Sequence, residues 1–91
     1  MNTVMQNKAI NIIDVRTMME FAEGHIPGAI NIPLDQLPHR HTEIEGLGTK
    51  PTWFYCRSGN RSGQAVMYLS QLGIGQVFNG GSMQQFIHQL N

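Results

Sequence analysis

The sequence has one cysteine, no formal net charge and no long apolar stretch. A single cysteine among 91 residues excludes an intramolecular disulfide, and a lone thiol is typical of a reducing compartment. Six basic and six acidic side chains give a formal net charge of zero, and no basic run favours nucleic acid or a membrane surface as a partner. No apolar run has transmembrane length, and no hydrophobic signal segment is present. We therefore expect a cytoplasmic protein without nucleic-acid or membrane partners.

Strand and helix patterns alternate along the chain. At this length one hydrophobic core is expected, so residues 1–91 are predicted to form a single domain. The β-rich apolar runs lie at 10–15, 29–32, 52–55 and 76–78, and the segments with helical spacing lie at 18–22, 33–37, 65–72 and 83–90. This alternation predicts an α/β fold with a small parallel sheet and helices on both of its faces.

The middle of the chain is less regular. Pro33 suits the first turn of a brief helix, and Pro38 is expected to stop it. Residues 39–49 are predicted to be a solvated loop, with at most a short helix that begins near residue 42. The glycine pair that follows Asn79 predicts a turn after the last strand.

The first strand is followed by polar residues for which we expect structural roles. The segment Thr17 to Glu20 has the spacing of a helix-capping box, and Gly24 is expected to end that helix. Asp14 and Arg16 are expected to pair with neighbouring groups. A histidine in a glycine- and proline-rich turn ordinarily bonds to backbone, so His25 is not expected to be catalytic.

The residues around Cys56 have the composition of a reactive site. They read Cys-Arg-Ser-Gly-Asn-Arg-Ser from 56 to 62, between a strand signal and a helix signal, and we call them the Cys56 loop. Such a loop directs backbone N–H groups and a helix N-terminus toward one point, which stabilises a thiolate. Arg57 and Arg61 offer bidentate donors for an oxyanion. A buried structural cysteine is the alternative, but the six residues after it include no apolar side chain.

The Cys56 loop resembles the active-site loop of the rhodanese (thiosulfate sulfurtransferase) family, in its small single-domain form. The shared features are the opening cysteine, a glycine in fourth place and a strand-to-helix setting. The segments 14–16, 20–21 and 24–29 are similar to the family's first signature. Gly81 to Phe86 is similar to a later one, with Ser82 in place of a second glycine and Phe86 in place of a tryptophan.

The resemblance implies a two-step sulfur transfer. Cys56 would be the catalytic nucleophile, would take a sulfane sulfur from thiosulfate or a similar anionic donor as a persulfide, and would pass it to cyanide or a thiol, including a protein thiol. The residues expected to bind substrate are Arg57, Ser58, Gly59, Asn60, Arg61 and Ser62. Ser62 suits a helix cap equally well. No cofactor and no metal is implied.

Two other functions use a similar loop. Cysteine phosphatases and arsenate reductases require five residues between cysteine and arginine, whereas Arg61 follows Cys56 after four and the longer spacing falls on Ser62. A persulfide carrier that receives sulfur from a partner protein would have the same loop as an enzyme. A metal site at His39-Arg40-His41 is disfavoured, because no third ligand follows at a recognisable spacing.

Overall fold

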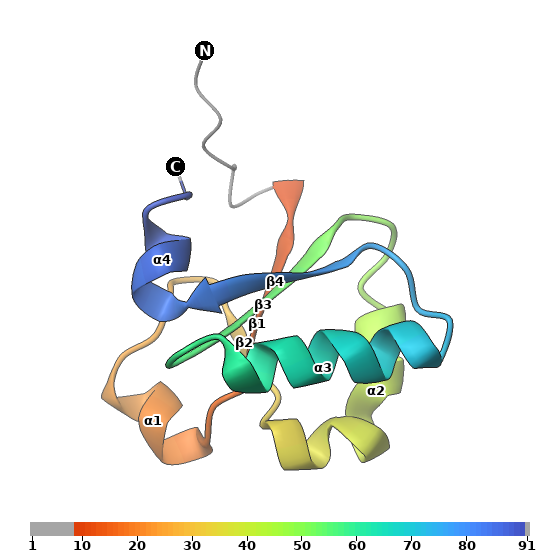
Figure 1. Cartoon of the computed structure of the whole chain (residues 1–91), viewed down its shortest axis with the longest axis horizontal. Helices are drawn as coiled ribbons and strands as arrows, with labels where there is room; N and C mark the ends of the chain where they lie inside the picture. The colour runs from red at the N-terminus through yellow and green to blue at the C-terminus, as the bar shows by residue number, and fades with distance from the viewer. Residues whose placement is uncertain (1–8, 91) are drawn as a thin grey trace.

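A four-stranded parallel sheet forms the centre of the computed structural model, which describes residues 9–90. The strands are β1 (Asn11–Asp14), β2 (Ile30–Asn31), β3 (Thr52–Cys56) and β4 (Val77–Ser82), and their spatial order is β2-β1-β3-β4. The helices are α1 (Met18–Glu23), α2 (Leu37–Glu45), α3 (Asn60–Gln71) and α4 (Met83–Ile87), and a 3₁₀ turn, η2 (Leu34–Gln36), precedes α2. The predicted parallel α/β architecture is confirmed (Figure 1).

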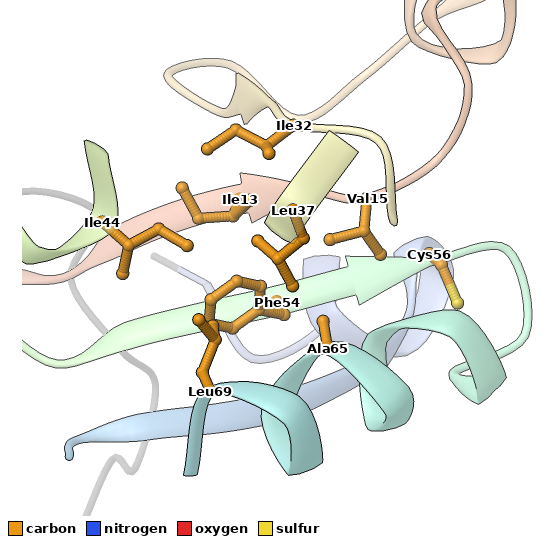
Figure 2. Close-up of a cluster of buried hydrophobic side chains, with 9 residues drawn as sticks. All are labelled: Ile13, Val15, Ile32, Leu37, Ile44, Phe54, Cys56, Ala65 and Leu69. Carbon is orange, nitrogen blue, oxygen red and sulfur yellow. The ribbon is translucent and has the colours of Figure 1, made fainter. Parts of the chain in front are cut away.

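Alternate residues of the strands supply two cores, one on each face of the sheet. Ile13 and Phe54 point toward α2 and α3, in a cluster that includes Leu37 and Leu69 (Figure 2). The intervening strand residues pack on the opposite face around Phe86 of α4. Because the period of a strand is two, each central strand contributes to both cores. The expectation of helices on both faces is therefore confirmed.

The predicted helix ends are largely correct. Thr17 and Glu20 form the capping box at the start of α1, and Gly24 is its C-cap. At the end of α3, Gly73 has a φ of 83° and donates its N–H to Ser70, while Ile74 donates to Leu69. This pair of bonds is a Schellman motif, which a left-handed glycine permits.

Two local predictions were wrong. Pro38 does not stop a helix: it lies in the first turn of α2, where a missing N–H costs no helical bond, and α2 occupies much of the expected loop at 39–49. Residues 79–81 are not a turn, because β4 continues to Ser82 with a bulge that leaves Gly80 unpaired.

Within residues 9–90, no helix has both the length and the apolar character that crossing a membrane requires.

Candidate active site

Cys56 is the last residue of β3, at the carboxyl edge of the sheet, which is where parallel α/β sheets ordinarily bind ligands. Its sulfur points toward the start of α3 and away from Phe54 (Figure 2). The residue is 0% exposed, because the Cys56 loop folds over it. The strand-to-helix position expected for the cysteine is confirmed.

The backbone of the Cys56 loop surrounds the sulfur with donors. The Gly59 N–H donates to Cys56 Sγ at 3.0 Å, and the Ser62 N–H donates at 3.4 Å. Gly59 has a φ of 95° and is the N-cap of α3, so the chain reverses sharply there and directs its amide inward. The first turn of α3 adds the positive end of its dipole.

These donors decide the acidity of the thiol. Burial alone raises the pKa of the Cys56 thiol, because it disfavours the charged form. The Ser62 side chain and hydrogen bonds from loop amides together outweigh burial, and the pKa of the thiol lies below its ordinary value. The site therefore favours a thiolate, the nucleophilic form of cysteine.

Ser62 links the thiol to the last strand. It is buried in the first turn of α3, with its hydroxyl 3.5 Å from Cys56 Sγ and 2.6 Å from Oδ1 of Asn79. Asn79 also donates through Nδ2 to the Gly59 carbonyl, at 3.1 Å. Gly59 is the helix N-cap, so the alternative in which Ser62 caps the helix is wrong. Ser62 instead lies beside the sulfur.

The two arginines of the Cys56 loop have different surroundings. Arg61 makes a bidentate ion pair with Glu20 of α1, with Nη1–Oε1 at 2.8 Å and Nη2–Oε2 at 3.1 Å. Arg57 has an 81% exposed side chain and lies 3.9 Å from the same carboxylate. Neither guanidinium donates a hydrogen bond to the sulfur. The donors nearest the sulfur are therefore the backbone amides of Gly59 and Ser62.

The remaining loop residues form the outer surface of the site. Ser58 and Asn60 are exposed, and the Ser58 hydroxyl accepts the Asn60 N–H at 3.3 Å. Of the six predicted substrate-binding residues, Gly59 and Ser62 donate hydrogen bonds to the sulfur, and the roles assigned to all six stay predictions.

The polar residues at the end of β1 and after it have the structural roles that were expected. Arg16 forms a buried ion pair with Asp14 and donates to the Gly24 carbonyl, each at 2.7 Å. His25 Nδ1 lies 2.9 Å from the Phe21 carbonyl, and its ring stacks on that of Phe21. These contacts fix the segment between β1 and β2. Neither Arg16 nor His25 contacts the Cys56 sulfur.

No group of three or more metal-ligating side chains occurs in the described part of the chain, residues 9–90. Arg40 pairs with Glu43 on α2, and His41 lies 3.4 Å from a carboxylate oxygen of Glu45. Arg40 and His41 therefore make ordinary helix-surface contacts.

Reasoning from the sequence missed two residues of the site, Glu20 and Asn79. Glu20 was recognised through its capping spacing and as part of the family's first signature, with a structural role in both, and its partner Arg61 lies 41 positions later in the sequence. Asn79 was assigned to a turn. A polar residue near the end of a strand is a weak signal, since its partners come from a loop 17 and 20 positions away.

Comparisons with known proteins agree with this geometry. The sequence model of the Rhodanese-like domain family matches residues 2–87 of this chain. A solved structure described as a rhodanese with anions from E. coli superposes with a TM-score of 0.76 at 35% identity, over 85% of this chain and 91% of that one.

Several curated proteins that carry different names are also similar to this chain in sequence. A sulfurtransferase of Allochromatium vinosum is 44% identical over 75% of this chain and 62% of its own length. The thiosulfate sulfurtransferase PspE of Escherichia coli is 36% identical over 79% of this chain and 69% of its own. The putative sulfur carrier protein YrkF of Bacillus subtilis is 33% identical over 84% of this chain and 40% of its own. The matched segment thus spans less than two thirds of two of these relatives. Because the family model matches nearly the whole chain, and the cysteine lies in the strand-to-helix loop at the sheet edge, the chain belongs to the rhodanese-like domain family.

Proposed function

We propose that this protein is a sulfurtransferase that carries a sulfane sulfur as a persulfide on Cys56. The observation that carries the proposal is the contact of one enclosed sulfur with two inward backbone amides, at 3.0 and 3.4 Å. These donors stabilise a sulfur anion where the reaction needs one. Thiosulfate is the proposed donor, and cyanide or a thiol is the proposed acceptor.

The transfer takes two displacements at sulfur. The Cys56 thiolate attacks the outer sulfur of thiosulfate, the S–S bond of the donor breaks, and its electron pair leaves with sulfite. The acceptor anion then attacks the outer sulfur of the persulfide, and the Cys56 thiolate leaves. With cyanide the product is thiocyanate, and with a thiolate it is a new persulfide. No external oxidant or reductant is required.

The Cys56 loop supports both steps. Amides that stabilise the thiolate also stabilise the terminal sulfur of the persulfide, in the way that an oxyanion hole stabilises oxygen. The exposed Arg57 and Ser58 lie at the rim, where a donor would arrive. Because Cys56 has no exposed surface, the donor reaches its sulfur only when the rim side chains or the loop move aside.

Intact mass spectrometry tests the proposal. The protein is treated with thiosulfate, with and without dithiothreitol, and thiocyanate is assayed after cyanide is added. We expect a gain of about one sulfur atom that dithiothreitol reverses, together with turnover. Cys56→Ser should show neither. A gain that persists in Cys56→Ser would contradict the mechanism.

A partner-dependent sulfur carrier is the second candidate. The ion pair that occupies Arg61 favours this candidate, because that guanidinium is then less available to hold a small free anion. A carrier would gain no sulfur from thiosulfate and would gain it when a cysteine desulfurase and cysteine are supplied. A phosphatase is disfavoured, because Arg61 points to Glu20 instead of completing an oxyanion site.

A further inference from the structure

Glu20 is the acidic side chain that meets the Cys56 loop. Its carboxylate accepts two hydrogen bonds from Arg61 and lies 3.9 Å from Arg57. It also accepts from the Thr17 amide at 2.9 Å and the Thr17 hydroxyl at 3.2 Å. One side chain therefore completes the cap of α1 and neutralises an arginine of the site.

The charges beside the sulfur follow from this arrangement. Arg57, Arg61 and Glu20 together leave one net positive charge at the rim, and a Cys56 thiolate cancels it. Glu23, which lines the same pocket as Glu20 and Arg57, adds a further negative charge. Arg16, a third guanidinium that lines the same pocket, is committed to Asp14 in a buried pair. Thiosulfate carries two negative charges, so it gains little attraction from this rim.

We infer that Glu20 is a specificity-determining residue, which offsets the charge of Arg61 and so makes the Cys56 site favour sulfur donors of low negative charge over small dianions. The thiosulfate part of this inference rests on the proposed function. The electrostatic part does not, because it concerns any anion that approaches the thiolate.

Two alkylating reagents of nearly equal size measure the electrostatic part directly. Iodoacetate is an anion and iodoacetamide is neutral, and both react with thiolates. Cys56 is the only cysteine, so intact mass follows its alkylation, with Cys56→Ser as the background. The ratio of the two rates, measured where each is proportional to reagent concentration, cancels changes in thiol pKa and in access to the buried sulfur.

Glu20→Gln is the main variant, because glutamine also serves in a capping box but carries no charge. We expect the ratio of the iodoacetate to the iodoacetamide rate to rise about fivefold or more at low ionic strength and to fall toward the wild-type value in high salt. Loading from thiosulfate should accelerate by a similar factor.

Two controls isolate the charge of Glu20 from other effects. Glu45→Gln removes an equal charge at the opposite edge of the sheet, where Glu45 lines a pocket with Thr52, the first residue of β3, and it should change the ratio less than twofold. Thr17→Ala weakens the helix cap and keeps the pair with Arg61, so it should leave the ratio unchanged.

The outcomes separate the two proposals. An unchanged or lower ratio in Glu20→Gln overturns the inference, because Glu20 would then be irrelevant to anions or would position Arg61 to bind them. If the ratio rises and no variant gains sulfur from thiosulfate, the inference stands and the thiosulfate donor is wrong. If Glu20→Gln does not fold, Arg57→Gln is measured in its place. We expect its ratio of the iodoacetate to the iodoacetamide rate to fall about fivefold, because Arg57 is the rim guanidinium that Glu20 does not neutralise. An unchanged ratio would overturn the inference.

Discussion

At the scale of single residues, Gly59 joins backbone conformation to thiol chemistry. Its φ of 95° is the left-handed region that favours glycine, and its N–H is the donor nearest to Cys56 Sγ, at 3.0 Å. A Cβ at this position would lie 3.2 Å from the Gly81 Cα, which is backbone and moves only with β4. A side chain there would therefore displace the amide from the sulfur.

We predict that Gly59→Ala lowers the free energy of unfolding by about 2 kcal/mol, from left-handed strain and the contact with β4. It should also raise the pKa of Cys56, since the thiolate loses its nearest donor. Denaturant unfolding measures the first effect, and the pH dependence of iodoacetamide alkylation measures the second.

Gly73→Ala is the matched control for this substitution. Gly73 also has a positive φ, 83°, but a Cβ there would meet nothing within 4 Å. It should lose about 1 kcal/mol from strain alone and leave the alkylation profile unchanged. Equal profiles for the two variants would show that the Gly59 amide does not stabilise the thiolate.

At the scale of elements, β4 holds the Cys56 loop through Asn79. The side chain of Asn79 accepts from Ser62 and from the Gly81 amide and donates to the Gly59 carbonyl. The bonds to Ser62 and Gly59 connect β4 to the beginning of α3, and the bond from Gly81 holds the Asn79 side chain within β4. The loop conformation thus depends on a strand that follows it in sequence.

Replacing Asn79 with alanine should lower the free energy of unfolding by about 1 to 3 kcal/mol, because it leaves the buried Ser62 hydroxyl with fewer partners. Hydrogen exchange at the amides of Gly59 and Ser62 should quicken. Asn60→Ala, at an exposed position, is the stability control. Unchanged exchange in Asn79→Ala would mean that the loop holds its conformation without β4.

Elements whose signals are local were predicted correctly, and elements that depend on distant contacts were not. The capping box of α1 and the glycine at the end of α3 involve residues that are neighbours in sequence. Pro38 illustrates the limit, because a proline is compatible with both the end and the first turn of a helix. The sequence does not reveal that η2 leads directly into α2.

The extension of β4 shows a second limit. Consecutive glycines ordinarily indicate a turn, but here their small size lets α4 approach: a Cβ on Gly80 would lie 2.8 Å from the Phe86 ring. The position of Cys56 and its backbone N–H donors were predicted from a local strand-to-helix pattern. The pairing of Arg61 with Glu20 required the folded arrangement of α1 and α3.

At the scale of the whole molecule, the ion pair between α1 and α3 links folding to pH. Arg61, followed by the Thr17 amide, lowers the pKa of Glu20 from 4.5 to about 2. A carboxyl whose pKa is lower in the folded state stabilises the fold above its unfolded pKa, and that stabilisation is lost as pH falls through the folded pKa.

We therefore expect the urea midpoint of the wild-type protein to fall between about pH 5 and pH 2. Glu20→Gln should have a lower midpoint than the wild type at pH 6 and a weaker dependence over this range. Its difference from the wild type should nearly vanish at about pH 2, where Glu20 is protonated in part even in the folded state. Parallel curves for the two proteins would contradict a folded-state pKa this low.

The enclosure of Cys56 also has a kinetic consequence. Because the sulfur has no exposed surface, every reagent waits for the same opening of the protein before it reacts. At low concentration, chemically different donors and alkylating agents show their own reactivities. At saturating concentration their rates converge on one ceiling, the opening rate, so loading becomes independent of the reagent used.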